Sequence, residues 1–493
     1  MEGSMRLLQK FMRRNEPVWM TKGTAGATMG PERMGEMDLL LAFLVFLSCV
    51  AACMVLEISL SWALLVGLIC FALVGLRRGY SARELGCMAA EEMKTAGKVL
   101  QILLLIGLLT ALWRAGGTVA FFVRTGVSLI TPNTFLLVAF LLPALFSMAF
   151  GSSFGVVGTA GVILMTIARS GGANLLAASG AIMSGIYVGE RLSPASSAAA
   201  VAAAVAGVDD RTFRSRMWRD TLIPFSITLI LYGILSPIYP IHQVDGQILQ
   251  ALSTGFHLSW PVILPAVALL ALPWLKVSAV RAILVSCILS VLCALLIQHM
   301  DPGQLLWACV VGYEATEPEL RDILSGGGLC SMLDVAVIVV LSCAYSGLFS
   351  GTGFLDPVVE KMGGLIDRIG LFATHVLLSF GTCMLFCNQT VGTVLSAQLT
   401  REEYRRRGLP PMEMAANIGN SVINLAGLVP WAIACSVPLA TMGVGISVLP
   451  FAFYLYLLPL CCWMAEIWKG RKKAGKELVE EKGPDHKNKL NYG

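Results

Sequence analysis

The chain is a succession of apolar runs, most of them near the length with which a helix crosses a lipid bilayer. They lie at 39–56, 60–76, 98–113, 133–150, 156–168, 173–188, 221–237, 259–275, 278–297, 331–349, 370–386, 416–436 and 446–465. Hydrophobic residues make up 56% of the 493 residues and charged residues 14%, which excludes an ordinary soluble domain. We therefore predict an all-α polytopic membrane protein with roughly 11 to 13 hydrophobic segments.

The two halves of the chain resemble each other at an offset close to 236 residues. The matches are "LWRAGGTV" at 112–119 with "LFSGTGFL" at 348–355, "LSP" at 192–194 with "LVP" at 428–430, and, at an offset of 237, "GSSFGVVGT" at 151–159 with "NQTVGTVLS" at 388–396. The last match pairs Gly155 with Gly392 and Thr159 with Ser396. The common order and spacing indicate a duplicated unit.

The charges that flank the two units predict opposite orientations in the membrane. The flank at 77–98 is basic, whereas its counterpart at 313–334 is acidic, and Lys and Arg collect in cytoplasmic loops. The predicted order is a cytoplasmic arm (1–38), two leading spans (39–76), a first repeat (77–219), connecting spans (220–312), a second, inverted repeat (313–445), a last span (446–465) and a cytoplasmic tail (466–493). Inverted repeats are typical of secondary transporters, whose site lies between the repeats near the midplane.

Each unit contains an apolar run that is interrupted by glycine and by hydroxyl or amide residues. The first interruption holds Gly151, Ser152, Ser153 and Gly155, and the second holds Asn388, Gln389, Thr390 and Gly392. Such breaks free backbone groups that a ligand can satisfy, although small residues also let helices pack closely. Residues 151–155 match G-x-S-x-G as well, but a nucleophile elbow needs a strand–turn–helix and a partner histidine. We therefore predict no enzyme activity.

Two adjacent charges, Glu190 and Arg191, lie in a small-residue apolar stretch just before Ser193 and Pro194. Ionisable residues at membrane depth are candidates for function by default. The two side chains can partly neutralise each other, and a glutamate that is buried there can exchange protons. A purely structural ion pair is the competing interpretation.

The motifs at the breaks resemble the NhaC-type Na⁺/H⁺ antiporter family. The resemblance is carried by "MAFGSSFGVVGTAGVILMTIA", "SGAIMSGIYVGERLSPASSAAAVAAAVAGVD" and "EMAANIGNSVINLAGLVPWAIACSVPLATMGV", and it covers most of residues 39–465. It implies a plasma (inner) membrane antiporter with interrupted central helices and proton-coupled sodium exchange. Some relatives are taken to exchange organic solutes such as malate and lactate.

The sequence departs from this family where its ligands are expected. The family reads Gly-Asp-Lys-Met-Ser-Pro-Leu-Ser-Asp-Thr-Thr-Asn, whereas this chain keeps a charge pair as Glu190 and Arg191 but has Ser197 and three alanines in place of Asp-Thr-Thr-Asn. In the second repeat the family's Leu-Glu-Asp-(Ala/Ser)-Gly becomes Ile-Gly-Asn-Ser-Val, with Asn420 at its centre. Glu190 is then the only obvious proton carrier, and the implied cation site is less negative.

We predict a monovalent cation/proton antiporter that works by alternating access, with Glu190 as the proton-coupling residue. The candidate binding residues are Ser152, Ser153, Gly155, Thr159, Glu190, Arg191, Ser193, Ser196, Ser197, Asn388, Gln389, Thr390 and Asn420. An alternative is exchange of a small organic anion or amino acid, held by Arg191 and the N-termini of half-helices. A third is a membrane protein with a decayed site and no transport. The sequence predicts no cofactor, no resident metal and no nucleic-acid partner; it expects membrane lipid and leaves a homo-oligomer open.

Overall fold

The structure is a computed structural model that describes residues 32–56, 58–129, 131–193, 196–241, 246–275, 277–352 and 362–481. Within these ranges the regular elements are helices, apart from one isolated bridge between Tyr313 and Gly326. The prediction of an all-α polytopic membrane protein is confirmed. Most of the predicted cytoplasmic arm, Pro194 and the end of the tail lie outside the described residues.

Four described helical segments are long and apolar enough to cross a membrane: Leu60–Arg77, Ser153–Ser170, Asp210–Ile238 and Cys330–Phe349. Two bent pairs also qualify as broken spans, Ala82–Lys94 with Val99–Ala115 (49°) and Pro411–Leu428 with Ile433–Met442 (48°). Shorter apolar helices lie at Met37–Cys53, Pro132–Met148, Ser197–Ala206, Trp260–Leu269, Val280–Leu296, Leu371–Phe386 and Phe453–Trp468. Breaks inside apolar runs thus divide many predicted segments into helices shorter than a full span.

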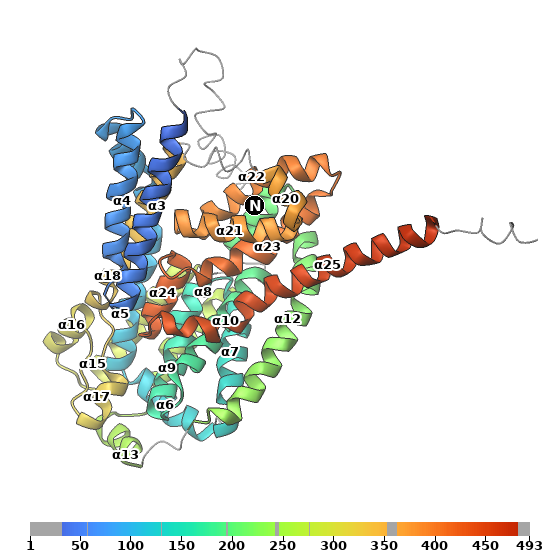
Figure 1. Ribbon diagram of the computed structural model, residues 1–493. Helices are drawn as coiled ribbons and strands as arrows, with labels where there is room; N and C mark the ends of the chain where they lie inside the picture. Colours follow the sequence, from blue (N-terminus) through green and yellow to red (C-terminus); the bar gives the residue numbers. More distant parts are fainter. Residues whose placement is uncertain are drawn as a thin grey trace, which may run out of the picture.

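The leading helices α3 (Glu32–Val55) and α4 (Leu60–Arg77) lie side by side at one edge of the molecule (Figure 1). Helix α18 (Leu333–Thr352) packs against α4 and along α5 (Ala82–Ala115). A cluster of aromatic rings joins these helices, with Phe46, Phe71 and Phe349 around Tyr345. The cluster ties the leading pair to the duplicated units.

The duplicated units match element by element at an offset of 236. Helix α7 (Phe135–Phe150) corresponds to α21 (Leu371–Phe386), the continuous segment of α8 (Ser153–Val156), η2 (Val157–Gly161) and α9 (Val162–Ser170) to α22 (Gln389–Arg406), α10 (Leu175–Leu192) to α23 (Pro411–Leu425), and α11 (Ser197–Ala206) to α24 (Ile433–Met442). Each first residue differs from its counterpart by 236, for example 135 from 371 and 197 from 433. The units are therefore repeats of one fold.

Backbone dihedrals correct the predicted register at the first break. Gly151 (φ 67°, ψ 19°) matches Cys387 (φ 55°, ψ 10°), and Ser152 (φ −142°, ψ 119°) matches Asn388 (φ −133°, ψ 119°). The sequence alignment paired Gly151 with Asn388, which is wrong by one residue. Identical letters misled it, because a left-handed residue followed by an extended N-cap, not glycine itself, defines the break.

The two repeats interlock through their half-helices. Helix α11 packs against α22 and α23 of the second repeat, while α24 packs against α8, η2 and α9 of the first. Each repeat thus places its second half-helix beside the break of the other. The inverted orientation relative to the membrane stays a prediction from the flanking charges.

Helix α12 (Asp210–Ile238) begins directly after the first repeat, and Asp209 is its N-cap through the N–H of Thr212. It is one continuous helix across the predicted boundary at 219/220.

The remaining elements are α6 (Thr118–Leu129), α13 (Gly246–Gly255), α14 (Leu264–Ala271), α15 (Ala279–Leu296), α16 (Pro302–Val310), α17 (Pro318–Leu324), α20 (Met362–Ile369), α25 (Phe453–Glu481) and the 3-10 turns η1 (Pro132–Thr134), η3 (Trp260–Ile263), η4 (Leu272–Leu275), η5 (Cys330–Met332), η6 (Ala426–Leu428) and η7 (Ile446–Phe451).

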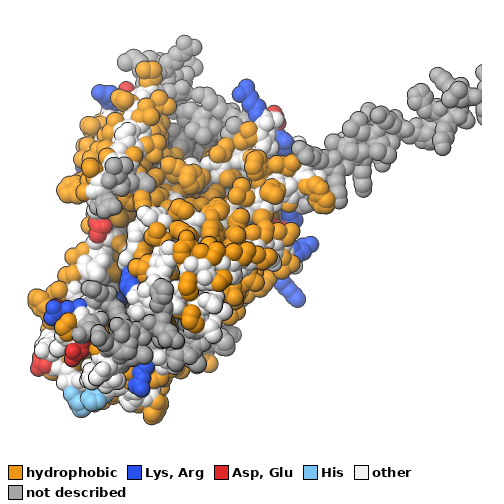
Figure 2. Space-filling model, turned by 60° about the horizontal axis from the view of Figure 1, so that its bottom comes forward, with side chains coloured by type: hydrophobic (Ala, Val, Ile, Leu, Met, Phe, Trp, Pro, Cys, Tyr) orange, Lys and Arg blue, Asp and Glu red, His pale blue; other side chains and the backbone are white. Residues whose placement is uncertain are grey.

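The outer surface is largely hydrophobic. Figure 2 shows hydrophobic side chains over most of one face, with charged side chains mainly toward its margins. Large exposed side chains such as Ile223, Ile288 and Trp307 are 61–67% exposed. A surface of this kind is suited to lipid. The chain is a multi-pass membrane protein.

Helices α7 and α10 approach so closely that Gly189 has no room for a side chain. A Cβ at Gly189 would lie 2.0 Å from the carbonyl carbon of Ser147. The Ser147 hydroxyl donates to Gly185 O (3.2 Å) and accepts from Gly189 N–H (2.8 Å). Small residues that permit such contact are common between membrane helices.

We expect Gly189→Ala to lower the thermal unfolding midpoint of the purified protein, because overpacking costs about 1–3 kcal/mol. The matched control is Gly233→Ala on α12, where a Cβ meets nothing within 4 Å. An unchanged midpoint for Gly189→Ala would show that the two helices separate without cost.

Candidate functional site

The break in the first repeat places the start of one helix against the end of the next. Helix α7 ends at Phe150, Gly151 turns the chain, and the Ser152 hydroxyl caps α8 by accepting from Gly155 N–H (3.4 Å). Ser153, buried at the first position of α8, is a side-chain hydrogen-bond partner of the Glu190 carboxylate. Glu190 itself lies in the last turn of α10.

Glu190 is incompletely paired. Its side chain keeps intermediate exposure, yet Oε2 is buried without a hydrogen-bond partner. A carboxylate oxygen left in that state is costly, because desolvation is not offset by a bond. The positive end of the Ser153–Ser170 helix favours negative charge nearby but does not occupy this oxygen. The Oε2 atom of Glu190 is therefore free to bind a proton or a cation.

Arg191 points away from Glu190, so the predicted ion pair between the two is wrong. Its guanidinium, 0% exposed, donates from Nε to Gly419 O (3.0 Å) and from the terminal nitrogens to Thr221, Tyr454 and Asn420. Neighbouring residues on a helix project about 100° apart, so one can face the break while the next faces α12 and α23. The interpretation of Arg191 as a modulator of Glu190 by direct pairing is thereby excluded.

The Arg191 cluster continues through Asp220, which the sequence reasoning missed. Asn420 donates from Nδ2 to Asp220 (2.8 Å), Asp220 also accepts from Arg216 (3.1 Å), and Arg216 donates to Glu413 (3.2 Å). The i, i+4 spacing of Arg216 and Asp220 was the available signal. Arg191 thus joins α10, α12, α23 and α25 as a buried, nearly fully bonded cation.

The break in the second repeat has the same backbone shape and no carboxylate. Asn388 Oδ1 accepts from the N–H groups of Thr390 (2.9 Å) and Val391 (3.4 Å), and Gln389 donates to Ile423 O (2.8 Å). Gln389 matches Ser153 in position, and both side chains reach the following long helix of their own repeat. The counterpart of Glu190 at the offset of 236 is Ala426. The second break is a neutral structural equivalent of the first.

The other predicted residues are divided among local roles. Thr159 donates to Gly155 O (2.9 Å) and Val156 O (3.1 Å) of its own helix. Ser196 caps α11 through Ala199 N–H and donates to the backbone carbonyl of Glu190. Ser193 is buried, whereas Ser197 and Thr390 are exposed. The structure therefore brings Ser153, Ser196 and Glu190 together and separates them from Arg191 and Asn420.

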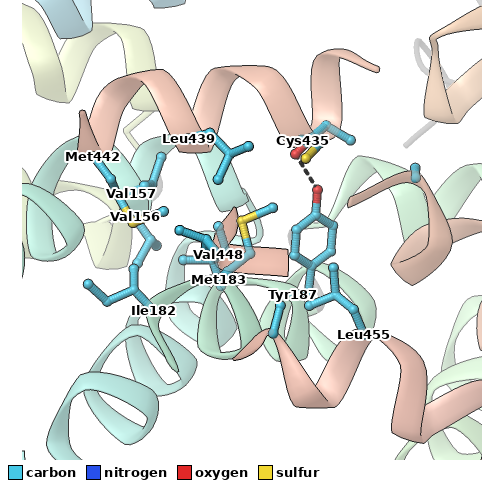
Figure 3. Close-up of a cluster of buried hydrophobic side chains, with 14 of the residues drawn as sticks. Val156, Val157, Ile182, Met183, Tyr187, Cys435, Leu439, Met442, Val448 and Leu455 are labelled. Atoms are coloured by element: carbon cyan, nitrogen blue, oxygen red, sulfur yellow. Dashed lines mark hydrogen bonds between the residues drawn. The ribbon is translucent and has the colours of Figure 1, made fainter. Parts of the chain in front are cut away.

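An apolar layer separates α24 from α10 beside the first break (Figure 3). Leu439 and Met442 of α24 face Val157 of η2 and Ile182 of α10 in that view. At one end of the layer the hydroxyl of Tyr187 donates to Ala434 O (2.5 Å). Asn424 lies on the neighbouring helix α23, and both polar atoms of its side chain are buried without a hydrogen-bond partner. Asn424 is thus another buried polar side chain without a partner, and it was not among the candidate binding residues.

The G-x-S-x-G string does not form a nucleophile elbow. Ser153 follows a helix, α7, and begins a helix, α8, whereas the elbow requires a strand before the serine. Its side chain is a partner of Glu190 rather than of a histidine. The string is thus a break between two helices.

Comparison with known proteins agrees with this architecture. The model of the Na⁺/H⁺ antiporter family matches residues 33–214 and 212–465. The chain is 27% identical over 434 residues to the Na⁺/H⁺ antiporter NhaC of Alkalihalophilus pseudofirmus, covering 85% of this chain and 93% of that protein. It is 26% identical to the malate-2H⁺/Na⁺-lactate antiporter of Bacillus subtilis (85% and 92% covered) and 26% identical to the arginine/ornithine antiporter ArcD of Halobacterium salinarum (82% and 86% covered).

The family match extends over both repeats, both breaks and the Glu190 site, and the relatives are covered over most of their length. The function it supports is secondary antiport, with a transporter rather than an enzyme as the class of protein. The chain belongs to the Na⁺/H⁺ antiporter family of the NhaC type.

Proposed function

We propose that the protein exchanges Na⁺ for H⁺ at Glu190, whose carboxylate binds either ion in turn. The observation that carries the proposal is the buried, unpartnered Oε2 at the first break. One carboxylate holds either Na⁺ or H⁺, but not both at once. The binding of one ion therefore requires the release of the other, which couples their movements. Ser153 supplies a neutral oxygen beside the carboxylate. Hard cations prefer such oxygen ligands.

The interlocked half-helices suit alternating access. Helices α11 and α24 each lie against the break of the opposite repeat, so a movement of one repeat relative to the other changes the cover of both breaks. The side chains of the apolar layer between α24 and α10, among them Val157, Ile182 and Leu439, are buried (Figure 3). Opening that layer in one state and closing it in the other would expose Glu190 to each side in turn.

The test uses purified protein in liposomes with an imposed pH gradient and a trapped pH-sensitive dye. We expect Na⁺ or Li⁺ added outside to dissipate the gradient, and K⁺ to do so far less. Protein-free liposomes serve as the control. If no cation and no organic solute moves protons while the protein remains folded, the non-transporting alternative replaces this proposal.

Exchange of an organic solute is the second candidate, because two relatives are a malate-2H⁺/Na⁺-lactate antiporter and an arginine/ornithine antiporter. The same liposomes therefore receive malate, lactate, arginine and ornithine. Arg191 argues against an anion at that side chain, because its donors already bind Gly419, Thr221 and Asn420. A response to an organic solute alone, with none to Na⁺ or Li⁺, would replace the cation in this proposal.

We further propose that the protein lies in the plasma membrane with both termini in the cytoplasm. The support is the charge asymmetry between the flanks at 77–98 and 313–334. The exposed Cys87 and Cys330, in those two flanks, offer a direct assay. We expect a membrane-impermeant thiol reagent added to intact cells to label Cys330 and spare Cys87; the reverse pattern would invert the topology.

A further inference from the structure

A buried histidine lies in the second repeat, away from Glu190. His375 is 0% exposed and lies in the first turns of α21. The ring of Tyr404 from α22 meets it edge to face, at 6.3 Å between centroids. The proposed exchange at Glu190 makes no use of this side chain.

Hydroxyl groups surround both nitrogens of the His375 ring. Nδ1 lies 3.4 Å from Ser379 Oγ and 3.5 Å from Ser421 Oγ, and Nε2 lies 3.4 Å from Thr400 Oγ1. These oxygens come from three helices, α21, α23 and α22. The contacts are at the long end of the hydrogen-bonding range, so the ring has room to tighten them.

The hydroxyl protons of this cluster are directed elsewhere. Thr400 donates to Ser396 O (2.7 Å) and Ser421 to Asn417 O (2.6 Å), which leaves Ser379 to donate to Ser421 (2.9 Å). All three oxygens therefore turn lone pairs toward the ring. A neutral imidazole can donate from one nitrogen only, whereas a doubly protonated ring donates from both. The cluster is arranged to receive a second proton on His375.

The fold does not require this polar cluster. At the offset of 236, the first repeat has Ala139, Leu164 and Gly185 where the second has His375, Thr400 and Ser421. In the first repeat, α10 packs against both α7 and α9 with those smaller or apolar residues in place. The cluster is thus an addition to the second repeat rather than a condition of its packing.

Polar groups also lie near the cluster toward both ends of α21. Toward the start of the helix, Glu466 of α25 accepts from Phe372 N–H (3.3 Å), one turn before His375. Toward the break, Thr400 lies one turn from Ser396, whose hydroxyl is 3.5 Å from that of Thr382. Thr382 in turn borders Gly392 at the break, where a Cβ would lie 3.4 Å from its hydroxyl.

Titratable side chains lie on each helix packed against α21. They include Arg401, Glu402, Glu403, Tyr404, Arg405 and Arg406 of α22, Glu413 of α23, Asp367 and Arg368 of α20, Asp334 and Tyr345 of α18, and Glu466 of α25. Of these, Tyr404 is the one in ring contact with His375. The arginines of α22 bind other groups: Arg401 donates to Val205 O and Arg406 pairs with Glu403.

We propose that His375 is a second protonation site, which passes protons between the α25 end of α21 and the second break. A proton binds Nδ1 from the side of Glu466, and the proton on Nε2 leaves toward Thr400, so the ring becomes neutral with its proton on Nδ1. A half-turn of the ring then restores the starting arrangement for the next proton. A charge inside the membrane is costly, so the ring holds both protons only in transit. The inference rests on the proposed proton-coupled exchange and adds a route to it.

The test is His375→Gln in the liposome assay, with rates measured over a range of pH. We expect the maximal rate of Na⁺-driven proton movement to fall by about 10- to 100-fold, since positioned proton transfer contributes on that scale. The Na⁺ concentration for half-maximal rate should change little, because Glu190 is intact. The pH dependence of the remaining rate should flatten. His257→Gln, at an exposed histidine, is the matched control.

A wild-type rate and pH profile in His375→Gln would overturn the inference. If that variant fails to fold, Thr400→Val removes the acceptor at Nε2 and keeps the ring; we expect it to shift the pH profile, and an unchanged profile would also contradict the route. Absence of any Na⁺-driven proton movement in the wild type would instead refute the proposed function, independently of His375.

Discussion

Replacing Glu190 by glutamine is expected to abolish sodium-driven proton movement. Glutamine keeps the size and one oxygen of the side chain, but it cannot release a proton and carries no charge for a cation. Because Glu190 is the acidic side chain at the first break and Ala426 takes its place at the second, the described residues at the breaks offer no substitute. We expect the liposome signal to fall to that of protein-free vesicles.

Two controls separate chemistry from folding. Glu413→Gln removes a carboxylate that lies in the Arg216 ion pair at the start of α23 and should retain exchange. Glu190→Asp keeps the charge but shortens its reach toward Ser153, so it should retain part of the rate with weaker Na⁺ dependence. A fully active Glu190→Gln would exclude Glu190 from the mechanism. Asn424, whose amide is also unpartnered, would then be the next candidate for the binding site.

The second large effect is on stability, at Arg191. Removing one member of a buried charged network costs about 3–5 kcal/mol, because its partners are left without bonds. Arg191→Met would leave Gly419 O and Asn420 Oδ1 unbonded between α10 and α23. We expect a marked fall in the thermal unfolding midpoint in detergent, and a smaller fall for Arg191→Lys, which keeps the charge but loses the planar fork.

The matched control is Arg219→Met, an exposed arginine on α12 beside Asp220. The thermal unfolding midpoint of Arg219→Met should stay close to that of the wild-type protein. The double variant Arg191→Met/Asn420→Leu should lose less than the sum of the single variants, since the two residues share one bond. A normal midpoint for Arg191→Met together with a change in transported solute would instead place Arg191 in the cargo site.

The membrane-protein class, the helical fold and the positions of the helix breaks could be predicted from local sequence. Long apolar runs leave a backbone no option but helix in a membrane, and a cluster such as Gly151 to Gly155 within such a run marks an interruption. The repeat was visible for the same reason, because matching breaks recur at matching distances. Its register was misread by one residue, since Cys387 adopts a left-handed conformation for which glycine is the usual signal.

The division of the candidate residues into sites could not be read from their order along the chain. Glu190 and Arg191 are neighbours in sequence, yet one faces a helix break and the other a network that reaches Asp220. The cluster around His375 could not be predicted, because only Ser379 is close in sequence and the other hydroxyl partners lie on α22 and α23, 25 and 46 residues away. A helix turns by about 100° per residue, so packing between helices distant in the chain sets which side chain meets which partner.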